Sequence, residues 1–285
     1  MLPTVDFFGT PVTRLIIGDN SMEGLSYIPR QHLSSEMLDY WTAERCMEAL
    51  REAERRGMNA YMAVADPFLL RVIRQYKNEG GKMHIMFQTY PPIDLEVGMV
   101  QMRKLGPLAV YHQGTTADIW LEEGKTAFLR DRIRRLKDMG IPVGLATHVP
   151  EVLKRVEDED WGLDFYMVCL QNSRKYEKEE STFLTGKEKT IVFRPNDRWD
   201  MFPVIREVRK PCIVFKIFAG GQMFYDRGEA EVPGLIEQSM REVFGGIKNT
   251  DIVLVGAFQK YKNQIRENAE ICARVLGEGG AAERP

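Results

Sequence analysis

The sequence predicts an α/β fold of the (β/α)8 TIM-barrel class, with an N-terminal segment resembling a β-hairpin and a long loop after the sixth strand. Short apolar runs alternate with amphipathic segments, and the 285 residues contain eight of each. Continuous apolar runs are typical of parallel strands covered on both faces. A doubly wound open sheet is the alternative, but no G-x-G-x-x-G turn follows the first run.

The order of these segments gives one strand and one helix per unit. The expected strands are 13–18, 59–65, 83–88, 108–112, 141–146, 164–170, 212–218 and 252–258. The expected helices are 43–57, 67–81, 93–106, 126–140, 150–160, 201–210, 233–246 and 260–277. Thr42 can cap the first helix, Pro67 and Pro150 open two others, and Gly57 and Gly140 follow helix ends.

The composition is ordinary for a soluble globular protein, and the predicted barrel leads us to expect a small-molecule substrate. One domain spanning 1–285 is expected, with 277–285 as a frayed tail. A formal net charge of −2 gives no reason to expect nucleic acid. No apolar run reaches the roughly 18–20 residues that cross a bilayer, no secretory signal is recognisable, and the scattered cysteines fit reduced thiols. We therefore expect a cytoplasmic protein without a membrane or nucleic-acid partner; the sequence leaves the oligomeric state open.

In a barrel of this class, chemistry gathers at the carboxyl ends of the strands. The candidate catalytic residues at those positions are His112, His148, Lys216 and Asp66. The candidate substrate-binding residues are Asn20, Gln88 and Asn172.

Each catalytic candidate has a structural alternative. Imidazole exchanges protons near neutrality, but His112 and His148 could instead hold loops by hydrogen bonds. An ammonium on an apolar strand must find a partner, so Lys216 is either a base or imine nucleophile, or the ion-pair partner of Asp19 or Asp66. Asp66 could equally cap the helix that follows it.

Two further interpretations stay open. A metal site can be drawn from His112, His148 and Cys169, but no H-E-x-x-H, CxxC or paired-carboxylate signature supports it, so a divalent metal is not favoured. Cys169 is more simply a small buried hydrophobe. The charged segment 173–197 is either a solvated excursion or a flap over the active site.

The sequence resembles the aldo-keto reductases, which are barrels that transfer hydride between NADPH and carbonyl substrates. The segment 8-FGTPVTRLIIG-18 is similar to the family's N-terminal hairpin and first strand. The segment 132-RIRRLKDMGIPVGLATHVPEVL-153 is similar to its fourth helix and fifth strand. The segment 108-LAVYHQG-114 is similar to its fourth strand, which implies the family's catalytic histidine at His112.

The segment 255-VGAFQKYKNQIRENAEI-271 is similar to the region where the family binds the adenosine phosphate of NADP(H). The residues that match the family's pattern there are Gly256, Ala257, Gln264, Glu267 and Asn268. The predicted cofactor contacts are Gly256, Ala257, Gln264 and Asn268, together with the nearby Lys260. A helix N-terminus with a nearby lysine suits a phosphate, whereas a solvated charged helix is the alternative.

Most of the family's catalytic Asp, Tyr, Lys and His set is missing from this chain. Met62 and Pro67 stand near the Asp and Tyr positions, and taking Asp66 as the aspartate puts Arg71 at the tyrosine. The third strand ends in 86-MFQTY-90, without the lysine. The usual proton donor for carbonyl reduction is therefore absent.

Two enzyme hypotheses follow, with a catalytically silent sensor as a third. The first is an atypical aldo-keto-reductase-like oxidoreductase that uses NADP(H) on a small polar carbonyl or sugar-like substrate. The second is a lyase, isomerase or hydrolase with acid–base chemistry from His112 and His148, with or without a metal. In it Lys216 stabilises an oxyanion or forms an imine.

Overall fold

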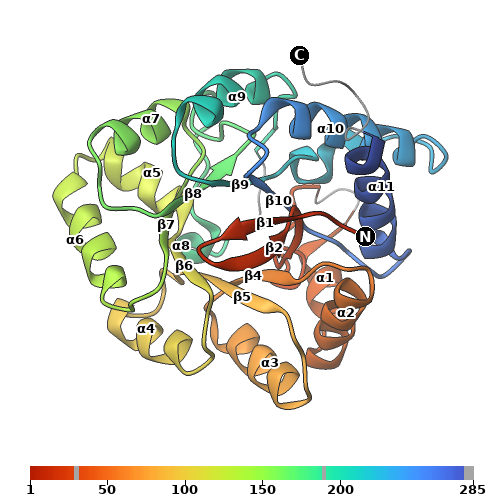
Figure 1. Ribbon diagram of the computed structural model, residues 1–285, viewed down its shortest axis with the longest axis horizontal. Coiled ribbons are helices and arrows are strands. Elements are labelled where there is room, and N and C mark those ends of the chain that lie inside the picture. The colour runs from red at the N-terminus through yellow and green to blue at the C-terminus, as the bar shows by residue number, and fades with distance from the viewer. Residues whose placement is uncertain (29–31, 188–190, 279–285) are drawn as a thin grey trace.

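The computed structural model describes residues 1–28, 32–187 and 191–278. Within them, eight parallel strands close into a barrel in the order β10-β3-β4-β5-β6-β7-β8-β9, surrounded by helices (Figure 1). The strands are β3 (Leu15–Gly18), β4 (Ala60–Val64), β5 (His84–Gln88), β6 (Ala109–His112), β7 (Val143–Thr147), β8 (Phe165–Cys169), β9 (Cys212–Phe215) and β10 (Ile252–Val255). The predicted (β/α)8 barrel is therefore confirmed.

The predicted helices are present with small boundary differences. They are α2 (Ala43–Arg55), α3 (Pro67–Asn78), α4 (Leu95–Arg103), α6 (Thr126–Lys137), α7 (Pro150–Asp158), α9 (Asp197–Glu207), α10 (Val232–Gly246) and α11 (Gln264–Glu278). The last helix extends to Glu278, and residues 279–285 of the expected frayed tail lie outside the described residues. The Thr42 hydroxyl caps α2 by accepting the Arg45 N–H at 3.3 Å.

Four helical segments were not expected from the sequence. They are α1 (Ser34–Tyr40), α5 (Gly114–Glu122), α8 (Thr182–Thr185) and the 3₁₀ helix η1 (Ala219–Phe224). All four lie in connections that leave the carboxyl ends of barrel strands, where binding and catalytic residues of such barrels are found.

Side chains on each strand alternate between the barrel interior and the surrounding helices. On β6, Ala109 and Tyr111 belong to the buried cluster that fills the interior, whereas Val110 belongs to the cluster shared with the helices. The interior cluster also contains Met167 of β8 and Ile213 of β9. This alternation decides which of the strand-end residues can meet.

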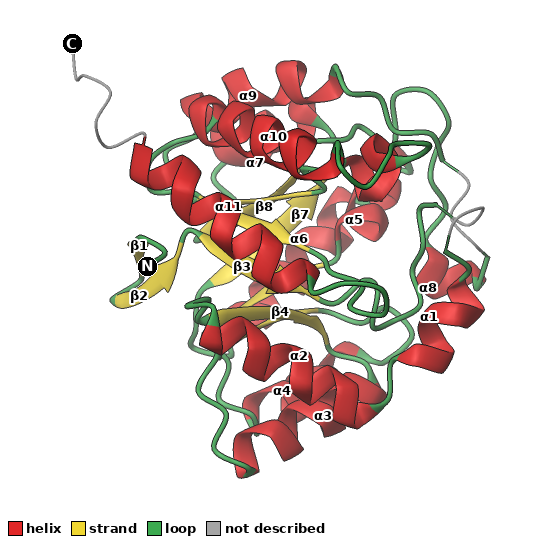
Figure 2. Ribbon diagram, turned by 90° about the vertical axis from the view of Figure 1, so that its right-hand side faces the viewer, coloured by secondary structure: helices red, strands yellow, loops and turns green. Residues whose placement is uncertain are grey.

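The N-terminal hairpin closes one end of the barrel. Its strands β1 (Thr4–Phe7) and β2 (Thr10–Thr13) pair in antiparallel fashion, as the sequence predicted. Phe7 and Val12 join the interior cluster, and the Phe7 ring lies 5.3 Å from that of Phe165. Figure 2 shows the hairpin at one end of the strands and the long connections at the other. Functional groups are therefore sought at the second end.

The connection between β8 and α9 lies across that second end. Arg174 fixes it to α5 through an ion pair with Glu122 at 2.6 Å. Ile191 and Phe193 pack with Tyr27, from the connection after β3, in a small buried cluster. The long loop predicted after the sixth barrel strand is thus folded against the barrel mouth. Across the ranges described, no helix combines the length and apolarity needed to cross a membrane.

Candidate active site

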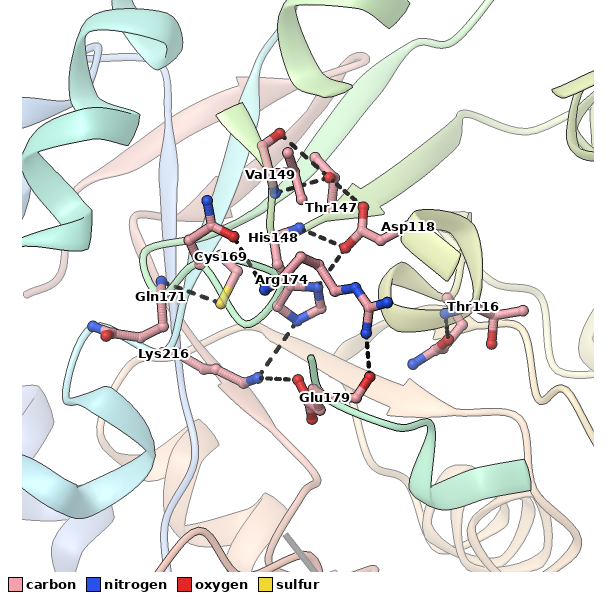
Figure 3. Close-up of polar contacts among 12 residues, drawn as sticks. Thr116, Asp118, Thr147, His148, Val149, Cys169, Gln171, Arg174, Glu179 and Lys216 are labelled. Atoms are coloured by element: carbon pink, nitrogen blue, oxygen red, sulfur yellow. Dashed lines mark hydrogen bonds and ion pairs between the residues drawn. The ribbon is translucent and has the colours of Figure 1, made fainter. Parts of the chain in front are cut away.

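The centre of the candidate site is a buried pair formed by His148, just after β7, and Asp118 of α5. Asp118 Oδ2 accepts hydrogen bonds from the ring Nδ1 of His148 at 2.8 Å and from its backbone N–H at 3.0 Å. Asp118 Oδ1 accepts the Thr147 hydroxyl at 2.6 Å. These contacts fix the imidazole orientation and assign a proton to Nδ1, so that Nε2 is left to face the mouth (Figure 3).

A glycine allows Asp118 to reach this position. α5 begins at Gly114, two residues after β6, and packs against β7. A Cβ atom on Gly114 would lie 3.0 Å from Cβ of Ala146 and 3.2 Å from Cε1 of His148. The close approach of α5 to β7 therefore depends on the missing side chain.

Lys216, directly after β9, brings an ammonium to the same place. Phe215 packs against the interior cluster, so regular alternation would turn the next side chain toward the helices. Lys216 instead has a positive φ of 57°, which interrupts the alternation. Its Nζ atom lies 3.4 Å from Nε2 of His148, and its side chain is only 6 % exposed.

Aromatic rings and a carboxylate surround this ammonium. Nζ lies 4.5 Å from the ring centroid of Tyr27 and 4.7 Å from that of Phe193, within the range of cation–π attraction. Oε2 of Glu179 lies 3.8 Å away. Burial lowers the pKa of Lys216, but Glu179, Tyr27 and Cys169 outweigh it, and the net change is upward. Lys216 is therefore a cation in this conformation.

Cys169 ends β8, the strand between His148 and Lys216. Its sulfur accepts the Gln171 N–H at 3.4 Å and is buried. Burial and Lys216 lower the pKa of His148, whereas Cys169 and Asp118 raise it, and the result is a pKa of about 9. A protonated Nε2 and the Lys216 ammonium would repel each other at 3.4 Å, so the raised pKa of His148 depends on Cys169 and Asp118.

Further polar groups lie at the ends of β3 and β5. Asp19 accepts the Val64 N–H at 2.5 Å, and burial is the main cause that raises its pKa to about 7. Tyr111 donates to Gln88 at 3.0 Å, and its pKa is raised by burial and by the charge of Asp19. This part of the mouth thus holds a carboxyl group that titrates near neutrality.

Asp66 has the helix-cap geometry that the sequence left open as an alternative. Its Oδ1 accepts the N–H groups of Phe68 at 2.6 Å and Leu69 at 3.2 Å at the start of α3. Glu23 lies beside it, and burial together with the charges of Asp66 and Asp19 raises the Glu23 pKa to about 10. A catalytic role for Asp66 remains a prediction.

His112 does not lie with His148 and Lys216. It follows Tyr111, whose side chain points into the barrel, so its own ring faces the helices. Arg132 donates to its Nε2 at 3.3 Å, and the ring of Trp120 lies 5.3 Å away. Burial and Arg132 lower its pKa to about 3, which keeps the ring neutral. The expectation that all three side chains face one cavity is therefore wrong for His112.

The predicted substrate-binding residues lie apart from one another. Gln88 is at the mouth beside Tyr111. Asn172 orders the long connection, because its N–H donates to Asp197 at 2.9 Å and its Oδ1 accepts the Arg174 N–H at 3.1 Å. Asn20 is exposed in the turn after β3. Their substrate contacts remain predictions.

The predicted cofactor residues follow β10 and form local contacts. Gln264 Oε1 accepts the Phe258 N–H at 2.8 Å, and the Ala257 carbonyl accepts the Ser21 hydroxyl at 2.5 Å. Lys260 pairs with Glu36 at 2.7 Å. The remaining two predicted contacts are Gly256, which is exposed, and Asn268, which is buried. Of the predicted cofactor residues, Lys260 lines a surface cavity of about 310 Å³. The other residues that line this cavity are Ser35, Glu36, Asp39, Tyr40 and Arg45.

A metal site does not form from the residues considered above. Among the described residues, no group of three His, Cys, Asp or Glu side chains could hold a metal ion. The set drawn from the sequence separates, because His112 faces the helices whereas His148 and Cys169 face the mouth.

Sequence reasoning missed three members of the site: Asp118, Tyr27 and Glu179. Asp118 lies on a helix that was not expected, and the other two come from connections. Nothing in the charged run around Glu179 distinguishes it from neighbouring glutamates. The strand-end rule could not find these residues, because folded connections bring them to the mouth.

The closed barrel and the polar groups at the carboxyl ends of its strands place the chain in the (β/α)8 TIM-barrel class. No known protein family and no curated protein matches the sequence. Solved structures match the fold. A truncated 3-deoxy-D-arabino-heptulosonate 7-phosphate synthase from Thermotoga maritima has a TM-score of 0.57 at 13 % identity, covering 98 % of this chain and 93 % of that one.

Two other solved structures give the same picture. A dihydropteroate synthase from Coxiella burnetii, in complex with pteroic acid, has a TM-score of 0.57 at 12 % identity over 94 % of this chain and 93 % of that one. The Gox0644 protein in complex with NADPH has a TM-score of 0.56 at 10 % identity over 98 % and 93 %. These likenesses establish the TIM-barrel fold and leave the aldo-keto reductase relation a resemblance.

Proposed function

We propose that the chain is an enzyme that moves protons on a small polar carbonyl compound, as an isomerase or lyase. The observation that carries the proposal is the buried Asp118–His148 pair with the Lys216 ammonium 3.4 Å from Nε2 of the imidazole. Enolisation of a carbonyl compound requires a proton donor for the carbonyl oxygen and a positive charge that stabilises the enolate. An imidazole held by a carboxylate and a neighbouring ammonium can supply both.

His148 is the proposed general acid. Its pKa of about 9 favours the protonated ring, which Asp118 holds at Nδ1, and an oxygen bound between Nε2 and Nζ of Lys216 would accept from both donors. A carbonyl oxygen bound in the mouth would receive the proton from Nε2 as negative charge develops on that oxygen. The three hydrogen bonds to Asp118 fix the donor in advance, which is the condition under which such donors are most effective.

Lys216 acts in this proposal as a fixed cation. Its pKa is raised, so the ammonium form dominates and an amine able to form an imine is scarce in this conformation. An ammonium in a buried site stabilises an enolate oxygen much more than it would in water. The imine alternative from the sequence is therefore the less favoured one.

Asp19 is the proposed base. A carboxyl with a pKa of about 7 is ionised in roughly half of the molecules at neutral pH, and it lies on the side of the mouth that holds Tyr111. Asp19 takes a proton from the carbon next to the carbonyl group, and the released electron pair forms the carbon–carbon double bond. The carbonyl electrons move to the oxygen, which is protonated by His148. In a substrate whose neighbouring carbon carries a hydroxyl group, the intermediate is an enediol. Asp19 then returns the proton to the former carbonyl carbon, the neighbouring hydroxyl loses its proton to the now neutral His148, and the carbonyl group re-forms on that neighbouring carbon.

Exchange of carbon-bound hydrogen with solvent tests this proposal without a known substrate. Pyruvate, dihydroxyacetone and dihydroxyacetone phosphate are incubated with the protein in D2O, and proton NMR follows the loss of signal. His148→Asn should slow exchange by at least about 100-fold, the scale of a lost general acid. His112→Asn is the matched control, and it should leave the rate nearly unchanged because its ring faces the helices. Equal losses in both variants would contradict the assignment.

NADP(H)-dependent carbonyl reduction is the second candidate. The observation that favours it is the cavity of about 310 Å³ that Lys260 and Arg45 line next to the predicted adenosine-phosphate site. A phosphate there would compete with Glu36 for Lys260. NADPH should therefore raise the melting temperature, more strongly in Glu36→Gln and less in Lys260→Met. No shift with NADPH in any of the three proteins would exclude this candidate.

A further inference from the structure

The candidate site already holds a carboxylate that belongs to the protein. Glu179, from the connection after β8, places Oε2 3.8 Å from Nζ of Lys216, and its side chain is 2 % exposed. The Tyr27 hydroxyl donates to the other carboxylate oxygen, Oε1, at 3.4 Å. Figure 3 shows this carboxylate facing the ammonium that also meets His148. An anion is thus bound at the point where the substrate of the proposed reaction would lie.

The backbone of the connection delivers this carboxylate. The Glu179 N–H donates to the Ser173 carbonyl at 3.0 Å, which closes a short loop. The Arg174 guanidinium bonds the Glu179 carbonyl and pairs with Glu122 of α5. The loop therefore has an anchor on α5 that does not involve the mouth, so departure of the carboxylate from Lys216 would loosen the loop without detaching it.

The contact between this carboxylate and the Lys216 ammonium is long. Charge-assisted hydrogen bonds from an ammonium to a carboxylate are typically about 2.7–2.9 Å, whereas Nζ of Lys216 lies 3.8 Å from Oε2 of Glu179. Moving a carboxylate out of water is costly and is offset only by good geometry. A small carboxylate that is free to adjust its position would form a shorter bond with the Lys216 ammonium.

Groups other than Glu179 also position the ammonium. The positive φ of Lys216 belongs to the turn after β9, and Tyr27 and Phe193 rings lie within 4.7 Å of Nζ. These rings limit the space around the ammonium. They favour a short ligand whose charged group is small and planar, as a carboxylate is.

We propose that Lys216, His148 and Tyr27 form a subsite for the carboxylate of a small substrate, and that Glu179 fills this subsite until substrate displaces it. The inference rests on the proposed function, because it names the substrate class of the same site: a carbonyl compound that carries a carboxylate, such as a 2-oxo acid. Glu179 is then a specificity-determining residue, since an incoming ligand must replace a carboxylate.

Titration calorimetry with pyruvate tests the subsite at equilibrium. Glu179→Gln removes the internal competitor and should bind pyruvate at least about tenfold more tightly than the unaltered chain, which is about 1.4 kcal/mol. Glu180→Gln is the matched control; this neighbouring glutamate is 60 % exposed and pairs with Lys187, so affinity should not change. Lys216→Met should abolish binding. An affinity in Glu179→Gln that is equal to or below that of the unaltered chain overturns the inference.

A second measurement on the unaltered chain covers the case in which Glu179→Gln does not fold. Saturating pyruvate should increase amide hydrogen exchange at Glu179, because the carboxylate leaves Lys216 and the short loop loosens. Exchange that stays the same while pyruvate is bound overturns the inference, and so does the absence of pyruvate binding in every protein tested.

The two proposals can fail separately. Pyruvate binding that is tightened in Glu179→Gln, without any exchange of carbon-bound hydrogen, supports the carboxylate subsite and contradicts the proton-transfer function. Exchange of dihydroxyacetone hydrogens without pyruvate binding supports the function and contradicts the subsite.

Discussion

The Nε2 atom of His148 and the Nζ atom of Lys216 lie 3.4 Å apart, although their strands β7 and β9 are separated by β8. The left-handed backbone at Lys216 makes this meeting possible, because it redirects a side chain that regular alternation would turn toward the helices. A non-glycine residue in a sparsely populated conformation costs about 1–3 kcal/mol. The surrounding structure must supply this free energy, which is common at functional sites.

Stability should depend on the protonation of His148. The pKa is about 9 in the folded protein and 6.5 for an ordinary histidine. Because the folded pKa is the higher one, the stabilisation is complete below about pH 6.5 and is lost as the pH rises through 9. The free energy of unfolding should fall by about 3 kcal/mol over this window. Urea denaturation measures it: His148→Asn should lack the decline, and His84→Asn should keep it.

Asp19 should make the protein less stable as the pH rises from 4 to 7. Its folded pKa of about 7 exceeds the ordinary 3.8, so its contribution is fully present below pH 3.8 and lost as the pH rises through 7. Asp19→Asn keeps an acceptor for the Val64 N–H and removes the charge. At pH 8 it should be more stable by about 2 kcal/mol, and the gain should vanish near pH 4. Exposed Asp39→Asn, measured by thermal denaturation alongside it, should show no such trend.

A methyl group on Gly114 should displace α5 and with it the Asp118 carboxylate that holds His148. In Gly114→Ala the new Cβ would lie 3.0 Å from Ala146, which forces α5 away from β7 and should destabilise the fold by about 1–3 kcal/mol. Asp118 moves with α5, so the pKa of His148, measured by NMR, should fall. Gly98→Ala in α4 is the control, because nothing lies within 4 Å of its added Cβ; it should be neutral or more stable by about 0.5–1 kcal/mol. The same response in both variants would contradict the tight contact.

Gln222 of η1 should hold the covering connections together. Its Nε2 donates to the carbonyls of Tyr27 at 2.9 Å and Ile191 at 2.8 Å, and its Oε1 accepts the Phe193 N–H at 2.8 Å. Gln222→Ala leaves these groups without their partner, so limited proteolysis within 170–196 should become several-fold faster. Gln238→Ala removes an exposed contact with Glu242 and should not alter the cleavage rate. An unchanged cleavage rate in both variants would show that the hydrogen bonds of Gln222 do not hold these connections together.

The barrel was predictable because its strands are apolar runs separated by helices with clear starts and ends. The same runs conceal which face each side chain takes. All four residues of β6 are buried, so the sequence around His112 carries no alternation from which to read its direction. His112 could therefore be placed at a strand end from the sequence but not on a side of the sheet.

The candidate site was predictable only where strands end. His148 and Lys216 stand out as polar residues after apolar runs. α5 was missed because it begins with Gly114, Thr115 and Thr116, which are weak helix formers, and Asp118 was missed with it. Glu179 was missed because its partner lies 37 positions further along the chain, and no local pattern records a contact between two connections.

The hydrogen bonds by which Gln222 holds the connections together should affect the rate of ligand binding. The Gln222 side chain joins three connections, the hairpin closes the far end of the barrel, and the Lys216 side chain is only 6 % exposed. We therefore expect a ligand to reach Lys216 after those connections separate. The connections would then separate before the ligand binds Lys216, at a rate set by the protein rather than by the ligand concentration. The observed association rate would then reach a plateau at high ligand concentration. The plateau value would equal the rate at which the three connections separate in the absence of ligand.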